Sequence, residues 1–495
     1  MSAAATTATS ASPTTSGFQT IIGLEVHAQV LTKSKMYCGC SADYANAAPN
    51  THVCPVCLGL PGALPVINRA AIDTVIRTGL ALNCTIPDHC KMDRKNYVYP
   101  DLPKGYQISQ YDLPLCIDGA ITFSVGGSEK TTGITRVHIE EDTGRLVHDD
   151  SFGGSASLVD LNRSGVPLME IVGEPDLRSP EEAREYLVAL RQILRYIGAS
   201  TANMEDGAFR CDANISIRAL DGSYVGPKVE IKNMNSFRAV ERALRFEEVR
   251  QREVVAQGGV LVQETRGWND GRGETTSQRT KEAAHDYRYF PEPDLPPLNI
   301  DQKAVDELRA QLPELPAVRW QRFIEDYGLA ASDAAILTEE RPIADIYQDA
   351  IAGTDDPETR RATANWIVND VMGLARARGM AVDALPLSAA QIADLVAAVQ
   401  GGKLTGRAAK DLLPQIDEGE LPSAAAARLN LLSIDDGDAV RQAAQEAIDA
   451  NPAVVADFRG GKQAAIGRLI GETMKRTGGR ARPDAVRATI LELLG

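Results

Sequence analysis

The sequence predicts an α+β protein whose two halves differ in structure. From residue 18 to about residue 300 the chain is rich in glycine, in turn residues and in short apolar stretches typical of strands. Beyond residue 300 nearly every segment carries apolar residues at helical spacing, and glycine there ends helices instead of separating strands. A chain of 495 residues is long enough for two or three domains. We therefore expect a strand-rich domain with a mixed or antiparallel sheet, followed by an all-helical region.

Within the strand-rich half, local signals predict two helices. Ser179 is a suitable N-cap, Pro180 fits the first turn, and apolar residues at helical spacing continue to Gly198. A second helix is expected over residues 236–257. The proline-rich stretch 289–297 breaks the pattern, and it is either a rigid linker or an ordered extended loop.

The second half is expected to contain a series of shorter helices separated by glycine and proline. These predicted helices lie at residues 304–312, 317–327, 358–378, 389–400, 406–413 and 438–450. Together with the change of composition near residue 300, they suggest four segments. We expect a leader at 1–17, a first domain at 18–300, a helical domain at 301–425 and a tail at 426–495.

Composition and charge exclude several classes of protein. Residues 1–17 are rich in Ala, Ser and Thr without a basic or apolar segment, so they predict a disordered leader and not a secretion signal. No apolar run of 18 residues is present, which argues against a membrane span and, without an export signal, predicts a cytoplasmic protein. The net charge is -15, so any contact with nucleic acid must come from a local basic patch.

Three apolar, strand-like stretches each carry carboxylates, and two of them also carry histidine. They lie at residues 21–27, 136–142 and 166–172. A carboxylate removed from water is costly unless it is paired or binds a metal. One such glutamate is most often a residue on the solvated face of a strand, but the recurrence favours a convergent acidic site suited to Mg²⁺ and phosphate chemistry.

Eight cysteines all precede residue 212, and four of them form two close pairs. Cys38 and Cys40 make the first pair, and Cys54 and Cys57 make the second after 13 intervening residues. Two thiolate pairs joined by a short loop can enclose one tetrahedral Zn²⁺, so a structural zinc knuckle is predicted over residues 38–57. Buried free thiols and a redox pair are the alternatives.

The end of the chain reverses the overall charge. Residues 453–495 hold eight Lys or Arg against four Asp or Glu, a local balance of +4. A glycine-containing turn between two predicted helices carries a group of these cations, which are Lys475, Arg476, Arg480 and Arg482. Such a turn can contact phosphates, although a solvated surface loop is an equally simple interpretation.

Two further clusters have both a functional and an ordinary interpretation. Arg94 and Lys95 are adjacent cations beside Tyr97, which suits a phosphate clamp as well as a surface charge run. Residues 204–217 place acids and a cation in a turn followed by a strand. That arrangement is typical of the rim of a nucleotide site, but also of a hairpin with a polar tip.

Long motifs carry a resemblance to a known family. The motifs are IGLEVH (22–27), DRKNY (93–97), YQISQ (106–110), RVHIEED (136–142), LVDLNR (158–163), RCDANIS (210–216), KNMNS (232–236) and DYRYFPEPD (286–294). From about residue 20 to the C-terminus the sequence resembles the B subunits of the bacterial aspartyl/glutamyl-tRNA(Asn/Gln) amidotransferases, the GatB/GatE family. Residues 1–17 lie outside the resemblance.

The resemblance implies a cradle-shaped catalytic domain, then a helical region and a helical tail like the YqeY proteins, which contacts tRNA. It implies a ligase reaction in which ATP phosphorylates the side-chain carboxylate of Glu or Asp misacylated on tRNA(Gln) or tRNA(Asn). Ammonia then displaces the phosphate to give Gln-tRNA or Asn-tRNA. The ammonia is expected from a separate glutaminase (amidase) chain, the A subunit of the complex, and a small C subunit is expected to complete the assembly.

The resemblance also implies roles for individual residues. Phosphoryl transfer depends on positioning and charge neutralisation, and Mg²⁺ prefers hard oxygen ligands. The expected Mg²⁺ and phosphate site consists of Glu25, His27, Glu140, Glu141 and Glu170. Arg94 and Lys95 are expected to neutralise phosphate charge, and the residues of second rank, expected to bind the nucleotide, are Glu205, Arg210 and Asp212. Because histidine is an unusual neighbour for Mg²⁺, a contact of His27 through water is as good an expectation as direct ligation.

Two other functions remain compatible with the residues. The chain could be mainly a tRNA-docking adaptor, with ATP handled at a site shared with partners. It could also be a free-standing carboxylate-amine ligase that acts on a small molecule. The basic end of the chain favours RNA over a small substrate.

Overall fold

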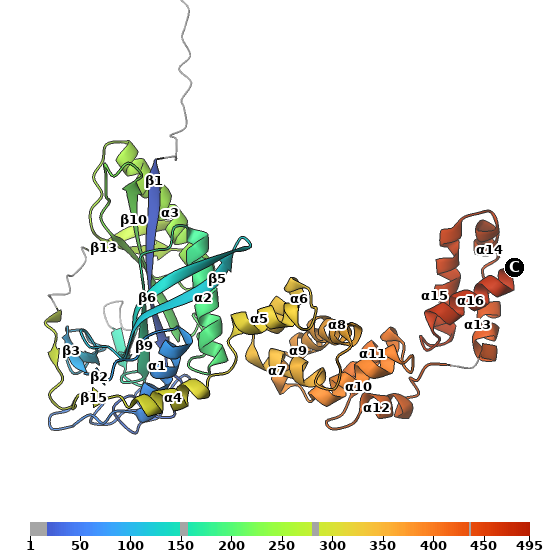
Figure 1. The fold of residues 1–495 in the computed structure, drawn as a ribbon, viewed down its shortest axis with the longest axis horizontal. Helices are drawn as coiled ribbons and strands as arrows, with labels where there is room; N and C mark the ends of the chain where they lie inside the picture. Colours follow the sequence, from blue (N-terminus) through green and yellow to red (C-terminus); the bar gives the residue numbers. More distant parts are fainter. Residues whose placement is uncertain (1–16, 149–156, 280–286, 435–436) are drawn as a thin grey trace, which may run out of the picture. The chain divides into compact units, whose positions relative to one another are not determined.

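The computed structural model describes residues 17–148, 157–279, 287–434 and 437–495. The predicted leader, apart from Gly17, lies outside these residues. The chain divides into two compact units, residues 1–315 and 316–495. The predicted α+β class is confirmed, because the first unit is built on a large mixed sheet and the second unit is helical (Figure 1).

An eight-stranded sheet forms the centre of the first unit. Its strands, in spatial order, are β13 (Glu274–Arg279), β12 (Thr265–Asn269), β11 (Val229–Lys232), β10 (Phe209–Ala219), β1 (Phe18–Gln29), β9 (Pro167–Gly173), β6 (Ser128–Glu141) and β5 (Cys116–Val125). Neighbours are antiparallel except for β11 and β12, which are parallel. The three acid-bearing stretches predicted from sequence become β1, β9 and β6, which are adjacent in the sheet.

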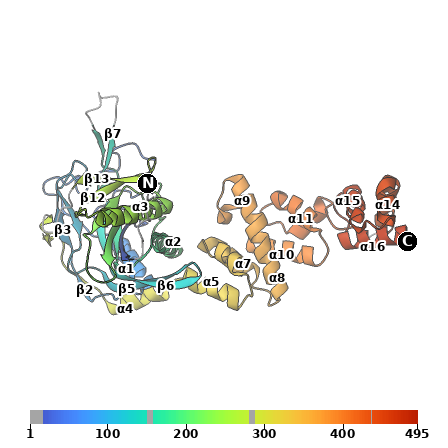
Figure 2. The same ribbon diagram turned by 90° about the horizontal axis from the view of Figure 1, so that it is seen from above.

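The two faces of this sheet differ because successive side chains of a strand point to opposite faces. In β1, Ile22, Leu24 and Val26 are buried in the apolar core, whereas Glu25 and His27 alternate with them. The core contains the helices α1 (Arg69–Ala81), α2 (Pro180–Tyr196) and α3 (Phe237–Ala256). Helix α2 contacts β5 and α3, and α1 contacts β5 and β6 (Figure 2). Helix α3 contacts β10. The polar face is therefore the one on which a site can form.

Both helices predicted in this half are present, and their caps follow the expected chemistry. The Ser179 hydroxyl accepts a hydrogen bond from the backbone N–H of Glu182, and Ser236 caps α3 in the same way. Helix α1 was not anticipated, because its N-cap, Asn68, follows a glycine- and proline-rich loop that gives no strong helix signal.

Small sheets border the main one. One of them joins β14 (Phe290–Pro291), β3 (Asp93–Asn96) and β4 (Tyr106–Ser109). The others pair β15 (Leu298–Asn299) with β2 (His89–Cys90), and β7 (Arg145–His148) with β8 (Ser157–Asp160). The proline-rich stretch 289–297 is thus an ordered extended segment, since its first residues pair with β3. Helix α4 (Gln302–Ala310) packs on α1.

The second unit contains two separate apolar cores, one formed between Phe323 and Ala426 and one between Val440 and Leu494. The helices around the first core are α5 (Pro316–Glu325), α6 (Ala331–Leu337), α7 (Arg341–Ala350), α8 (Pro357–Asn365), α9 (Met372–Arg378), α10 (Ala389–Gln400), α11 (Gly406–Leu412) and α12 (Pro422–Arg428). The helices around the second core are α13 (Gly437–Asp449), α14 (Pro452–Arg459), α15 (Ile466–Arg476) and α16 (Pro483–Leu494).

The predicted helix at 358–378 is interrupted, because a π-helical turn, Trp366–Val371, separates α8 from α9. In the part of the chain that the structure describes, no helix is both long and apolar enough to cross a membrane.

Candidate functional site

A histidine–glutamate–histidine trio lies on the polar face of the main sheet. The antiparallel register places His27 of β1 opposite Glu170 of β9, and Glu170 opposite His138 of β6. The Glu170 Oε2 atom lies 3.4 Å from Nε2 of His27 and 3.4 Å from Nε2 of His138. A single buried carboxylate therefore joins the side chains of three adjacent strands.

Two more carboxylates extend this trio. Glu140 Oε1 is 3.8 Å and Glu25 Oε1 is 4.0 Å from the same Nε2 atom of His27. The side chains form two overlapping groups, Glu25–His27–Glu170 and His138–Glu140–Glu170, and the candidate ligand atoms within each group lie within 4.8 Å of one another. We call these five residues the acid–histidine cluster. Its oxygen-rich donors, with two imidazoles, fit a divalent cation.

Burial and charge act strongly on the ionisable groups of the cluster. Burial alone would lower the pKa of His27, but its hydrogen bond to Glu170 and the charges of Glu170, Glu140 and Glu25 raise the pKa to about 9. Burial would raise the pKa of Glu170, but His138 and His27 outweigh it and hold the pKa well below its usual range. Burial and the charge of Glu170 raise the pKa of Glu25. The positive charge favoured on His27 thus offsets the negative charge of the carboxylates around it.

Lys95 supplies a positive charge at the border of the cluster. Burial would lower its pKa, but Glu140 and Glu170 more than offset that effect and raise it. The ammonium also lies 5.1 Å from the ring centre of Tyr287 and 6.0 Å from that of Tyr97. Lys95 is therefore a partly buried cation near carboxylates and aromatic rings, which suits a group that binds phosphate.

Two residues expected in this site lie elsewhere. Glu141 follows Glu140 in β6, and because consecutive residues of a strand face opposite ways, it turns away from the cluster. It pairs with Lys104 and accepts a hydrogen bond of 3.0 Å from the backbone N–H of Ile108. Glu141 and Lys104 line a separate cavity of about 220 Å³.

Arg94 is likewise directed away from the cluster, because it alternates with Lys95 along β3. Its guanidinium makes a two-point ion pair with Glu292, with N···O distances of 2.7 and 2.8 Å, and it also pairs with Asp294 at 3.2 Å. These ion pairs of Arg94 stabilise the extended segment around β14. In this arrangement the guanidinium is not available to bind phosphate next to Lys95.

The three residues expected to bind the nucleotide, Glu205, Arg210 and Asp212, do not lie together. Glu205 is exposed, and with Arg210 it lines a cleft of about 1460 Å³. Arg210 Nη2 lies 2.9 Å from Asp142 Oδ1, and this carboxylate also accepts a 2.8 Å hydrogen bond from Gln29. Asp212 faces Glu25 across β1 and β10, and it pairs with Lys232. Arg210 and Asp212 therefore flank the acid–histidine cluster along one strand, whereas Glu205 lies in a loop.

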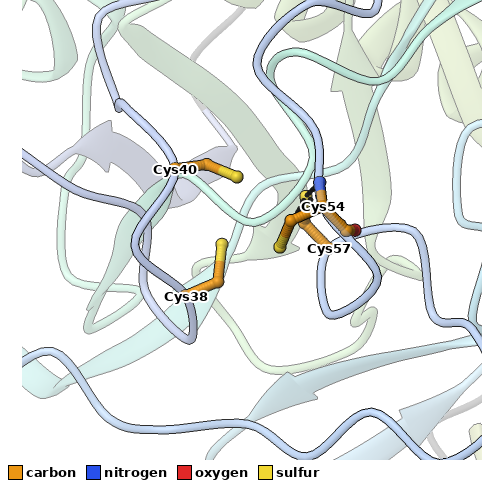
Figure 3. A group of neighbouring side chains, drawn as sticks. All are labelled: Cys38, Cys40, Cys54 and Cys57. Atoms are coloured by element: carbon orange, nitrogen blue, oxygen red, sulfur yellow. Dashed lines mark hydrogen bonds between the residues drawn. The ribbon is translucent and has the colours of Figure 1, made fainter.

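The four paired cysteines come together as predicted from their spacing. The sulfur atoms of Cys38, Cys40, Cys54 and Cys57 lie within 4.8 Å of one another, with the thiols of the first pair directed toward the second (Figure 3). A hydrogen bond from Cys38 lowers the pKa of the Cys57 thiol to about 4, and burial raises that of Cys40 to about 11. Four convergent soft sulfur donors fit one tetrahedral Zn²⁺.

A buried lysine lies beside the cysteine cluster. Lys35 has no exposed surface, and its ammonium donates hydrogen bonds to the carbonyl oxygens of His52 at 2.7 Å and Leu161 at 3.4 Å. The same ammonium lies 3.7 Å from the Cys57 sulfur. Lys35 thus places its ammonium beside the Cys57 thiol, whose pKa is lowered.

The basic turn between α15 and α16 makes several contacts within the second unit. Arg480 donates to the carbonyl oxygen of Asn430 at 3.2 Å and to its side-chain oxygen at 3.0 Å. Arg476 pairs with Glu472 on its own helix and with Glu446 at 3.8 Å. Two of the four cations proposed for RNA are therefore already hydrogen-bonded or ion-paired in the chain itself.

Sequence reasoning did not select four residues that the structure places in or beside these sites: His138, Asp142, Lys104 and Lys35. His138 could have been found, because residues 136, 138 and 140 share one face if 136–142 is a strand. The roles of Lys35 and Lys104 could not be predicted from the sequence, since their partners, Leu161 and Glu141, are distant along the chain.

The chain is thus an α+β protein whose sheet carries a largely buried acid–histidine cluster and whose second half is helical. Comparison with known families agrees with this division. The model of the GatB/GatE catalytic domain matches residues 20–306, and the model of the GatB domain matches residues 345–494.

Individual relatives give the same result over nearly the whole chain. The B subunit of the aspartyl/glutamyl-tRNA(Asn/Gln) amidotransferase of Thermomicrobium roseum is 56% identical over 96% of this chain and 99% of that protein. The B subunits of the same name from Dehalococcoides mccartyi (strain CBDB1) and Carboxydothermus hydrogenoformans are 50% and 47% identical, over 94% and 96% of this chain and 97% and 99% of theirs. The chain belongs to the family of aspartyl/glutamyl-tRNA(Asn/Gln) amidotransferase B subunits.

Proposed function

We propose that this chain is the ATP-dependent subunit of a tRNA amidotransferase of the cytoplasm. It phosphorylates the side-chain carboxylate of Glu or Asp carried by tRNA(Gln) or tRNA(Asn), and ammonia from the glutaminase A subunit then displaces the phosphate. A small C subunit completes the assembly. The observation that carries the proposal is the convergence of His27, Glu140 and Glu170 on the polar face of the main sheet, next to Lys95 of the neighbouring strand β3.

The cluster has the chemistry that this reaction needs. A carboxylate is a poor electrophile, so it must first be converted to an acyl phosphate, whose phosphate can leave. Phosphoryl transfer requires little covalent chemistry from the protein and depends on positioning and neutralisation of negative charge. When bound, Mg²⁺ would supply that neutralisation, held by Glu25, Glu140, Glu170 and His27, with His27 binding directly or through water.

The residues around the cluster complete the proposed site. Lys95 binds a transferring phosphoryl group by charge and is kept protonated by Glu140 and Glu170. Arg210 and Asp212 border the cluster on β10, and together with Glu205 at the cleft they are proposed to contact the nucleotide. Glu141 and Arg94 are proposed to act indirectly, by fixing β4 and β14 beside the site.

The other two regions receive separate roles. The four cysteines are proposed to hold a structural Zn²⁺ that fixes the loop at residues 38–57, at a distance from the reacting groups. Lys475, Arg476, Arg480 and Arg482 are proposed to contact tRNA phosphates, which position an RNA without reading its bases.

One assay separates this proposal from the two alternatives. ATP hydrolysis is measured with the full assembly and with the isolated chain, each in the presence of misacylated tRNA, uncharged tRNA or free glutamate. We expect turnover to require the misacylated tRNA and to be lost in Glu25→Gln, while the exposed Glu129→Gln keeps it. Loss of a metal ligand should slow activation roughly 10²-fold or more. Turnover with free glutamate would indicate a small-molecule ligase, and normal turnover in Glu25→Gln would remove the site from the mechanism.

A further inference from the structure

A stacked pair of tyrosines borders the acid–histidine cluster and has no part in the chemistry described above. The ring centres of Tyr111 and Tyr289 are 4.4 Å apart, and their planes differ by 12°. Tyr111 keeps 48% of its surface exposed although it stacks on its neighbour. A half-exposed aromatic ring held by a stacked neighbour offers surface on which another flat π-system, such as a nucleobase, can stack.

Tyr289, one of the two stacked rings, lies near Lys95, the cation of the site. The antiparallel register pairs Phe290 with Arg94, which places Tyr289 at the position opposite Lys95. Tyr287 also contacts the Tyr289 ring edge-on, with ring centres 6.1 Å apart, and its own ring lies 5.1 Å from the Lys95 ammonium. The ring of Tyr289 thus lies next to Tyr287, whose ring is close to the same cation that we place beside the transferring phosphoryl group.

Tyr111, the other stacked ring, lies near the carboxylates of the acid–histidine cluster. The backbone N–H of Tyr111 donates to Asp93 Oδ2 at 3.0 Å, which fixes the start of the loop after β4. Two residues earlier, the hydroxyl of Ser109 donates to Glu140 Oε2 at 3.3 Å. Two residues of extended chain span at most about 7 Å, so the backbone of Tyr111 lies close to a residue that contacts the cluster.

We propose that Tyr111 and Tyr289 bind the terminal adenosine base of the aminoacylated tRNA by stacking. The proposal rests on the proposed function and names the part of the RNA that the site holds. It also assigns the base a place next to the reacting carboxylate, where stacking contributes affinity without hydrogen bonds that read the base.

Two adenosines take part in the reaction, one in ATP and one at the end of the tRNA, and their chemistry favours the one in the tRNA as the base that stacks on the tyrosines. The amino acid is esterified directly to the terminal ribose of tRNA, so its carboxylate and the terminal base are held close together. In ATP a triphosphate chain separates the adenosine from the reacting phosphorus. A base platform beside the carboxylate cluster therefore matches the tRNA terminus better than the adenine of ATP.

Fluorescence tests the stack without relying on catalysis. A tRNA with 2-aminopurine in place of its terminal adenine is titrated with the full-length chain in its active assembly, since stacking quenches this fluorophore. We expect quenching with the wild type and with Tyr111→Phe, and little quenching with Tyr111→Ala or Tyr289→Ala. Tyr99→Ala is the matched control, because Tyr99 is exposed to a similar extent, 47%, and lies outside the stacked pair.

Steady-state kinetics tests whether the stacked base belongs to the tRNA or to ATP. Tyr111→Ala should raise KM for the misacylated tRNA about tenfold or more, as the loss of one stacked base predicts. The value of kcat at saturating RNA and the KM for ATP should stay within about twofold of wild type, and Tyr111→Phe should restore the KM for RNA.

Three results would overturn the proposal. Equal quenching by wild type and both alanine variants excludes the stack. A raised KM for ATP alone assigns the platform to the nucleotide instead. If the Tyr111→Ala variant separates from its companion subunits on gel filtration, the ring contacts a protein subunit and not the RNA. Failure of the proposed function looks different, because the wild type would then lack tRNA-dependent ATP turnover even if the fluorophore is quenched.

Discussion

The carboxylate of Glu170 lies 3.4 Å from the imidazole Nε2 of His27, across two adjacent antiparallel strands. The same oxygen is 3.4 Å from Nε2 of His138 on the opposite side, so Glu170 is the shared member of both groups of candidate metal ligands. An exchange at this position should therefore affect more of the site than an exchange at any single neighbour.

Glu170→Gln should abolish ATP-dependent activation while leaving tRNA affinity unchanged. The amide removes the negative charge between two histidines and weakens any metal site, which should reduce the rate roughly 10²-fold or more. Phosphate release with misacylated tRNA and a separate filter-binding titration measure the two properties. Glu174→Gln, an exchange just beyond the end of β9 where the side chain bonds Thr135, should be neutral in both assays. Normal phosphate release by Glu170→Gln would refute the central role.

The metal-free protein should lose stability as the pH rises from about 6.5 to 9. The pKa of His27 is raised from 6.5 to about 9, so the folded state favours its protonated form. The stabilisation that protonated His27 gives the fold is complete below the pKa of histidine in the unfolded chain, and it disappears as the pH rises past the pKa of His27 in the folded chain. The difference between these two pKa values corresponds to roughly 3 kcal/mol. Urea denaturation in the presence of a chelator at successive pH values measures this. His27→Gln should flatten the profile, whereas the exposed His89→Gln should not.

Zinc should be present at about one ion per chain, bound by Cys38, Cys40, Cys54 and Cys57. Cys54→Ser should lower both the zinc content and the melting temperature, because the binding energy of a structural zinc also stabilises the fold. Elemental analysis and thermal denaturation provide the measurements. Cys84→Ser alters a buried thiol outside the cluster and should keep the metal. Protein without metal, with all four thiols open to titration, would show that the cluster is not a zinc site.

Lys35→Met should destabilise the first unit and accelerate loss of zinc to a chelator. Methionine cannot donate to the carbonyl oxygens of His52 and Leu161, and an unpaired buried acceptor costs about 1–3 kcal/mol. It also removes a positive charge beside Cys57. Lys33→Met, two residues away and exposed, is the matched control for denaturation and for zinc release. Identical behaviour of the two variants would leave Lys35 without a role at the cluster.

Loss of cations from the basic turn should flatten the salt dependence of tRNA binding. Each phosphate contact contributes a slope of about 0.7 to 0.9 in log affinity against log salt, so a Lys475→Ala/Arg482→Ala pair should lower the slope by about 1.4 to 1.8. If all four cations contact phosphate, the fourfold variant should lower it by roughly 3 to 4. Arg441→Ala, which removes the partner of Glu492, is a control elsewhere in the tail. An unchanged slope in the fourfold variant would leave the turn as surface.

The sequence determined the α+β class, several strands of the main sheet and most of the longer helices. These features depend on local patterns: alternation placed β1, β6 and β9, and the caps Ser179 and Ser236 placed α2 and α3. The spacing of Cys38, Cys40, Cys54 and Cys57 also predicted the cysteine cluster that the structure shows, because a short loop limits how far the two pairs can separate.

The tertiary structure alone decided which residues meet. Only strand order and register bring His27, Glu170 and His138 together, and they come from three stretches that are far apart along the chain. Register also turned Glu141 and Arg94 away from the cluster, since a shift of one residue along a strand moves a side chain to the opposite face. Local sequence carries the alternation of a strand, but the partner of each strand depends on long-range packing, and so the composition of the site became visible only in the folded chain.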